Sequence, residues 1–106
     1  MKSYAIGHLR NVAMGPSIVT YLERIDATLA PHGGKFIVHG GAQDLLEGTF
    51  ACDVIIIEFP DIDMARAWYR SGAYQAILPL RTKHSDSTVF LVRGVDADHK
   101  ATDILG

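Results

Sequence analysis

The segment from Ile57 to Arg81 constrains the fold of this chain most, because it joins a strand pattern directly to a helix pattern. Its first three residues are apolar, acidic and apolar, and they close an apolar run that is typical of a buried strand. Asp61 is a favoured N-cap, so we expect a helix to begin there. The predicted inward stripe of this helix comprises Ile62, Ala65, Trp68 and Tyr69. Such a helix requires a sheet to pack against.

Two breaks divide the rest of this segment. Ser71-Gly72 is expected to interrupt the helix, and Pro79 is expected to end a short helical turn that carries Tyr74. We therefore expect Arg81 on an extended stretch beyond the helices.

The other elements follow from the same strand and helix periodicities. Strands are predicted over residues 3–9, 35–39, 53–59 and 88–92, and a first helix is predicted from Gly15-Pro16 to the Gly33-Gly34 pair. The order βαββαβ, with a central hairpin, predicts an α+β fold of the ferredoxin-like type. In that fold a four-stranded antiparallel sheet carries two helices on one face. We assign this single domain to residues 1–95 and a polar C-terminal tail to residues 96–106.

Two of the predicted strands are apolar on both faces. Residues 54–57 and 89–92 contain no polar side chain, although two helices can cover only one face of the sheet. At about 25 cal/mol per Å² of apolar surface, leaving the second face in water forfeits several kcal/mol. We therefore predict a homodimer packed sheet to sheet, a dimeric α+β barrel. The alternative is that the tail or the long hairpin folds over that face.

Composition excludes several classes of partner. Ten basic and twelve acidic residues are mixed along the chain, with a net charge of -2, so no basic stripe exists for nucleic acid or an anionic membrane. The single Cys52 fits a reducing compartment, and the start of the chain lacks the apolar stretch of a signal peptide. No apolar run approaches the roughly 20 residues of a membrane span. We expect a cytoplasmic protein.

Five phrases of the sequence resemble a known family when they are taken in order. They are HGGKFIVHGG, LLEG, IIIEFP, ARAWYRSGAYQAILPLR and VFLVRG. The family is a bacterial one known as domain of unknown function thirteen-thirty, in the dimeric α+β-barrel superfamily, and the resemblance implies the same fold and dimer. Residues 11–17 depart from it, because members usually carry an Asp-Pro turn and a following acidic residue there. The resemblance supplies no established reaction.

In a layer of helices over a sheet, the natural ligand space is the cleft between the two layers. Trp68, Tyr69 and Tyr74 are candidates to line it, and simple packing in the core is the alternative. Arg81 is a candidate for a bidentate grip on a carboxylate. Its alternative is a structural salt bridge with Glu58, because an acid inside a buried strand needs a partner.

Histidines supply the candidates for proton transfer. A hairpin centred on residues 48 and 49 places His39 opposite Glu58, and an imidazole beside a carboxylate can serve as a general base. A bulge at Gly40-Gly41 would shift this register and send the two side chains to opposite faces. His8 lies near a strand end as a further ligand-binding candidate. A metal triad of His8, His39 and Glu58 lacks any short-spaced ligand motif, so no metal is predicted.

These features together favour a protein that binds a small organic molecule. Its catalytic form would be a cofactor-independent acid-base enzyme for an aromatic or carboxylated compound, because the chain has no dinucleotide, nucleotide or serine-hydrolase motif. The alternative is a non-catalytic dimeric module that binds a partner or only builds structure. An open cleft between helices and sheet favours the first reading, and a closed interface favours the second.

Overall fold

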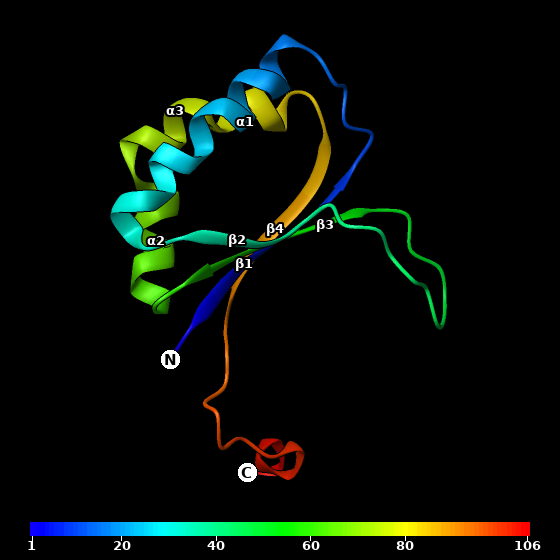
Figure 1. Ribbon diagram of the computed structural model, residues 1–106, viewed down its shortest axis with the longest axis vertical. Coiled ribbons are helices and arrows are strands. Elements are labelled where there is room, and N and C mark those ends of the chain that lie inside the picture. Colours follow the sequence, from blue (N-terminus) through cyan, green and yellow to red (C-terminus); the bar gives the residue numbers. More distant parts are fainter.

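The structure is a computed structural model that describes residues 1–106. Its elements in chain order are β1 (Ser3–Arg10), α1 (Pro16–Leu29), η1 (Ala30–His32), β2 (Lys35–His39), β3 (Asp53–Phe59), α2 (Ile62–Arg70), α3 (Gly72–Thr82), β4 (Asp86–Arg93) and η2 (Ala101–Leu105). The four strands form one antiparallel sheet in the order β2-β3-β1-β4. The three α-helices lie on the same side of this sheet (Figure 1). The predicted ferredoxin-like fold is confirmed, with its second helix divided into α2 and α3.

The predicted helix boundaries hold at three places. Pro16 begins α1, and Gly33 follows η1 with a left-handed φ of 68°, a conformation that glycine adopts without strain. The carboxylate of Asp61 accepts a hydrogen bond of 2.8 Å from the backbone N–H of Met64, as expected of an N-cap. Ser71 ends α2 and its hydroxyl accepts from the backbone N–H of Tyr74, so the same residue begins α3.

The expected end of a helical turn at Pro79 is wrong, because α3 continues through this proline to Thr82. Tyr74, Ile77 and Arg81 are all buried and lie at helical spacing on one face. The packing of this face against α1 outweighs the roughly 3 kcal/mol that an interior proline costs a helix. Arg81 is therefore placed by the last turn of a helix and not by an extended stretch.

The register of the β2-β3 hairpin also differs from the prediction. Lys35, not His39, lies opposite Glu58, while His39 lies opposite Ile55. The pairing shifts between Phe36 and Val38, so the irregularity falls inside β2 and not at Gly40-Gly41. Because a shift of one residue exchanges the faces of a strand, His39 and Glu58 point to opposite sides of the sheet. The predicted pairing of these two residues is wrong.

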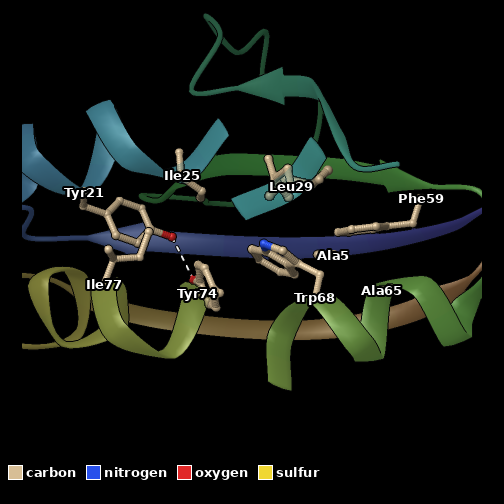
Figure 2. Close-up of a cluster of buried hydrophobic side chains, with 10 residues drawn as sticks. Ala5, Tyr21, Ile25, Leu29, Phe59, Ala65, Trp68, Tyr74 and Ile77 are labelled. Atoms are coloured by element: carbon tan, nitrogen blue, oxygen red, sulfur yellow. Dashed lines mark hydrogen bonds between the residues drawn. The ribbon is translucent and has the colours of Figure 1, made fainter. Parts of the chain in front are cut away.

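The core lies between the sheet and the helices. Figure 2 shows Phe59, Trp68 and Tyr74 packed there beneath Ile25 and Leu29 of α1. The ring of Trp68 lies 4.1 Å from that of Tyr74 and 5.4 Å from that of Phe59, measured between centroids. Its indole N–H donates to the hydroxyl of Thr28, which in turn donates to the carbonyl of Ile25. The polar atom of the tryptophan is thereby satisfied inside an apolar layer.

The other face of the sheet carries no helix. Its side chains include Ile6, Ile56 and Phe90, which occupy one row across β3, β1 and β4. Phe90 remains 44% exposed. The β2-β3 loop projects past the sheet, and the segment after β4 leads away from it to η2 (Figure 1). Ile104 and Leu105 in η2 are exposed, so the tail does not cover the open face.

No helix of this structure is both long enough and apolar enough to cross a membrane.

Candidate functional site

A cavity of about 270 Å³ lies between the helix layer and the sheet. Most of its wall is apolar and comes from α1, α3 and the helix-facing side of the strands. The lining residues are Ala5, Gly7, Leu9, Val12, Met14, Ile18, Tyr21, Leu22, Ile25, Phe36, His39, Gly40, Asp53, Ile55, Ile57, Trp68, Tyr74, Arg81 and Val89. The helix-sheet interface is therefore open, as the ligand-binding interpretation expects.

Arg81 supplies the cation of this cavity. It is only 5% exposed, and its guanidinium carbon lies 5.9 Å from the centre of the Tyr21 ring. Its one side-chain hydrogen bond runs from Nη1 to the hydroxyl of Ser87, at the start of β4. No carboxylate lies within salt-bridge distance of it. A guanidinium has five N–H donors, so Arg81 retains donors for a further acceptor.

Two tyrosines lie beside Arg81. The hydroxyls of Tyr21 and Tyr74 are 2.8 Å apart and buried, and Figure 2 shows them meeting from α1 and α3. Burial raises the pKa of the Tyr21 hydroxyl, and the neighbouring Tyr74 raises it further. The hydroxyl of Tyr21 therefore stays protonated near neutral pH. Because one hydroxyl donates to the other, one O–H of the pair stays available to an acceptor in the cavity.

The exposed part of the cavity wall lies at the opposite edge of the sheet. His39 and Asp53 are exposed and come from the end of β2 and the start of β3. The imidazole of His39 stacks on Phe36, with ring centres 4.4 Å apart and planes 13° apart. The cavity thus joins a buried cationic end to a mouth that carries an imidazole and a carboxylate.

The segment of residues 11–17 also contributes to the cavity wall. Val12 and Met14 line the cavity there, and Met14 is exposed. This segment therefore adds apolar side chains to the wall.

Several candidate residues lie around one cavity. Trp68, Tyr74, Arg81 and His39 all line the one cavity. The two alternatives offered for the aromatics both apply to Trp68 and Tyr74, since each is buried in the core and also faces the cavity. Tyr69 does not line the cavity and only packs against the core from outside.

Glu58 lies outside the cavity, on the open face of the sheet. Its carboxylate is 3.0 Å from the ammonium of Lys2 and 3.6 Å from that of Lys35. The hydrogen bond from Lys2 lowers the pKa of Glu58 below its usual value. The proposed salt bridge between Glu58 and Arg81 is therefore wrong, because the two side chains lie on opposite faces.

His8 also points to the open face and does not line the cavity. Its ring meets Phe50 of the β2-β3 loop at 5.3 Å and Phe90 of β4 at 6.2 Å, both edge-on. It borders a shallow polar depression that also includes Cys52. No group of three or more histidine, cysteine or acidic side chains is arranged to hold a metal ion. The imagined triad of His8, His39 and Glu58 is not assembled.

Sequence reasoning missed two polar residues of the cavity. Tyr21 lies within the predicted first helix, and its hydroxyl gains its role only because α3 places Tyr74 opposite it. Asp53 was read only as the start of a strand. The alternation of side chains along β3 could have identified Asp53, because Asp53 shares the face of Ile55 and Ile57.

The fold is shared with solved structures of low sequence similarity. RPA0582 from Rhodopseudomonas palustris, described as a protein of unknown function, has a TM-score of 0.67 and 19% identity over 90% of this chain and 83% of that chain. SnoaB from Streptomyces nogalater, described as a cofactor-independent oxygenase, has a TM-score of 0.59 and 17% identity over 93% and 98%. Rv0793 from Mycobacterium tuberculosis has a TM-score of 0.51 and 11% identity over 93% and 100%.

These likenesses show the fold alone. No curated protein matches the chain significantly. The model of one family, described as domain of unknown function DUF1330, matches residues 2–95 and so spans the whole sheet and all three helices. The chain belongs to the DUF1330 family.

Proposed function

We propose that this protein binds a small organic acid in the cavity between its helices and its sheet. Arg81 holds the carboxylate of the ligand, and the apolar wall encloses a body about the size of one ring. The observation that carries this proposal is the state of Arg81, which is buried against the cavity with a single hydrogen bond and no counter-ion.

The energetics of burial support an anionic ligand. Placing a charged group out of water costs several kcal/mol unless hydrogen bonds and an opposite charge compensate for it. In this chain burial opposes the charge of Arg81, while Ser87, Tyr74 and Tyr21 favour it and leave its pKa raised, but none of these partners is a carboxylate. A carboxylate is a planar acceptor that matches the fork of a guanidinium, so it supplies the missing interactions.

Size and polarity limit the ligand further. Pockets for drug-sized ligands range from about 300 to 1,000 Å³, so a cavity of about 270 Å³ suits a smaller compound. Rings of Phe36, Trp68 and Tyr74 contribute to the wall and favour an aromatic or branched aliphatic body. The open cavity also favours a ligand-binding protein over a purely structural module.

The charges of the cavity orient such a ligand. Arg81 attracts the carboxylate toward the buried end, and the spare phenolic hydrogen of the Tyr21-Tyr74 pair offers it a further donor. Asp53 at the mouth repels an anion. The body of the ligand then extends toward His39. This arrangement also suits acid-base chemistry without a cofactor.

A thermal-shift screen with Arg81→Met tests the proposal. Benzoate, phenylacetate and phenylpyruvate are the probes, and Arg70→Met is the matched control because Arg70 is an exposed arginine at the end of α2. A ligand at 100 times its dissociation constant stabilises by about 2.7 kcal/mol. Because each kcal/mol raises the melting temperature by about 4–8 °C, a bound acid should raise it clearly in the wild type and in Arg70→Met.

Arg81→Met should remove that ligand-induced shift, while the unliganded variant stays folded because methionine is an apolar replacement of similar length. If Arg81→Met keeps the full shift, or if none of the three acids stabilises the wild type, the proposal is wrong.

We also propose that two copies of the chain pack through their open sheet faces. Ile6, Val54, Ile56, Phe90 and Val92 form an apolar surface there that neither the tail nor a helix covers. An exposed surface of this kind is typical of an interface between subunits. Sedimentation at micromolar concentration tests the proposal, and a monomer there contradicts it.

A further inference from the structure

We propose that His39, with Asp53 behind it, removes a proton from the carbon of a bound acid that lies next to a carbonyl group. This inference rests on the proposed function, because it requires that Arg81 hold the carboxylate of the ligand. It replaces the pairing of His39 with Glu58, which the two faces of the sheet separate.

His39 is the group in the cavity that is suited to exchange protons. The titratable and charged side chains of the wall are Tyr21, His39, Asp53, Tyr74 and Arg81. Arg81 stays charged and Tyr21 stays protonated near neutral pH, whereas histidine is the side chain that ordinarily changes its charge between about pH 5 and 8. His39 is also exposed, so it can return its proton to water.

The register of the sheet places Asp53 beside His39. His39 lies opposite Ile55, and Asp53 precedes Ile55 by two residues on the same face of β3. Such diagonal neighbours lie about 7–8 Å apart. No direct ion pair joins the imidazole of His39 to the carboxylate of Asp53, so the carboxylate acts on the imidazole through space or through one water. The stacking of His39 on Phe36 holds the plane of the imidazole. Asp53 can therefore stabilise the imidazolium that forms when His39 takes up a proton.

The positions of Arg81 and His39 suit a ligand held between them. Arg81 is fixed to Ser87 on β4, and His39 lies on β2, so the two residues approach the cavity from opposite edges of the sheet. These outer strands are three strand spacings apart, about 14 Å. An acid held by its carboxylate at Arg81 therefore extends across the cavity toward His39.

The proposed step needs no oxidant and no cofactor. A neutral nitrogen of His39 takes the proton of the C–H bond, and the electron pair of that bond moves through the carbon to the carbonyl oxygen, giving an enolate. The spare phenolic hydrogen of the Tyr21-Tyr74 pair and the donors of Arg81 can stabilise the negative oxygen. Return of a proton to the same carbon gives exchange, and return to the oxygen gives the enol tautomer. The ligand class is a small carboxylic acid with such an acidic C–H bond, for example a 2-oxo acid.

Hydrogen exchange of phenylpyruvate in D2O, followed by proton NMR, tests this inference. The wild type should accelerate loss of the CH2 signal over buffer. His39→Gln should reduce the enzymatic rate by about 100-fold or more, the usual contribution of a general base, and Asp53→Asn by a smaller factor. The matched controls are His8→Gln and Glu58→Gln, which alter a histidine and an acid of the open face and should leave the rate unchanged.

The pH profile distinguishes a proton-transfer role from a structural one. In wild type the rate should rise with pH as one group loses its proton, and this rise should be absent in His39→Gln. Binding of phenylpyruvate without accelerated exchange, or unchanged exchange in His39→Gln, overturns this inference and leaves the proposed function standing. Failure of phenylpyruvate and of the other acids to stabilise the wild type overturns both.

Discussion

The two faces of the sheet come from the same strands and differ in almost every physical respect. The face toward the helices holds the aromatic core, the cavity and an arginine that lacks a counter-ion. The open face carries an apolar surface and, at one end, an acid that is satisfied by two lysines. We propose that the first face binds an anion and that the second packs against another apolar surface. Because side chains alternate between the two faces of a strand, neighbouring residues belong to the proposed ligand site and to the proposed dimer interface.

The largest expected effect comes from removing the central ring of the helix-covered face. Trp68→Ala deletes a side chain that is fully buried and hydrogen-bonded to Thr28, so it should reduce the free energy of unfolding by about 3–5 kcal/mol. Phe90→Ala on the open face should cost under about 1 kcal/mol within a single chain. Urea unfolding at low protein concentration measures both. Equal losses would show that the two faces do not differ as described.

Charge on the open face should affect association more than folding. Phe90→Lys places an ammonium in the middle of the apolar surface, next to Ile6. We expect dimer affinity to fall about 100-fold, equivalent to roughly 2.8 kcal/mol, with the chain still folded. Sedimentation across a concentration series measures this change, and circular dichroism checks the fold. An unchanged molecular mass would place the interface elsewhere.

Replacing the two tyrosines tests whether their hydroxyls stabilise the fold through the hydrogen bond between them. Tyr21→Phe and Tyr74→Phe should each cost about 1–2 kcal/mol, because each leaves one buried hydroxyl without its partner. The double variant should cost less than the sum, since it removes both hydroxyls together. Urea unfolding of all four proteins gives the coupling energy. Strict additivity would mean that the two hydroxyls do not interact in solution.

The smallest expected effect concerns the charge cluster on the open face. The pKa of Glu58 is lowered in the folded chain, chiefly by Lys2, so the carboxylate stabilises the fold at pH values above its unfolded pKa. That contribution is lost as the pH falls through the lowered pKa. Glu58→Gln should therefore melt slightly below wild type at neutral pH and match it in acid. Glu47→Gln, at an exposed loop position, is the control. If Glu58→Gln still melts below wild type in acid, the lowered pKa of Glu58 is not the cause of the difference.

Much of the fold was predictable because its signals are local. Asp61 begins α2, Ser71 ends it, and the Gly33-Gly34 pair follows η1, each where expected and each through contacts within one turn of the chain. The prediction at Pro79 was wrong because it considered only the local cost of a proline to a helix. The contact of α3 with α1 outweighs that cost, and it joins segments far apart in the chain. Phe90 and Val92 of the apolar strands stay exposed on the open face, which no helix covers.

The candidate site was predictable in its residue types and not in its pairings. Trp68, Tyr74, Arg81 and His39 were identified because aromatic, cationic and imidazole groups near predicted element ends are unusual. Their partners depended on a shift between Phe36 and Val38 that no turn signal marks. That shift separated His39 from Glu58 and placed it beside Asp53.

By itself, the sequence determined the order of elements, the ferredoxin-like topology and the presence of two apolar sheet faces, because periodicity and capping act over a few residues. Only the tertiary structure decided that Arg81 lies on a helix beside Tyr21 and Tyr74, that Glu58 pairs with lysines and that His39 faces the cavity. These outcomes depend on strand register and on packing between distant helices. A change of one residue in register reverses which face a side chain occupies, so local patterns cannot specify a site built across strands.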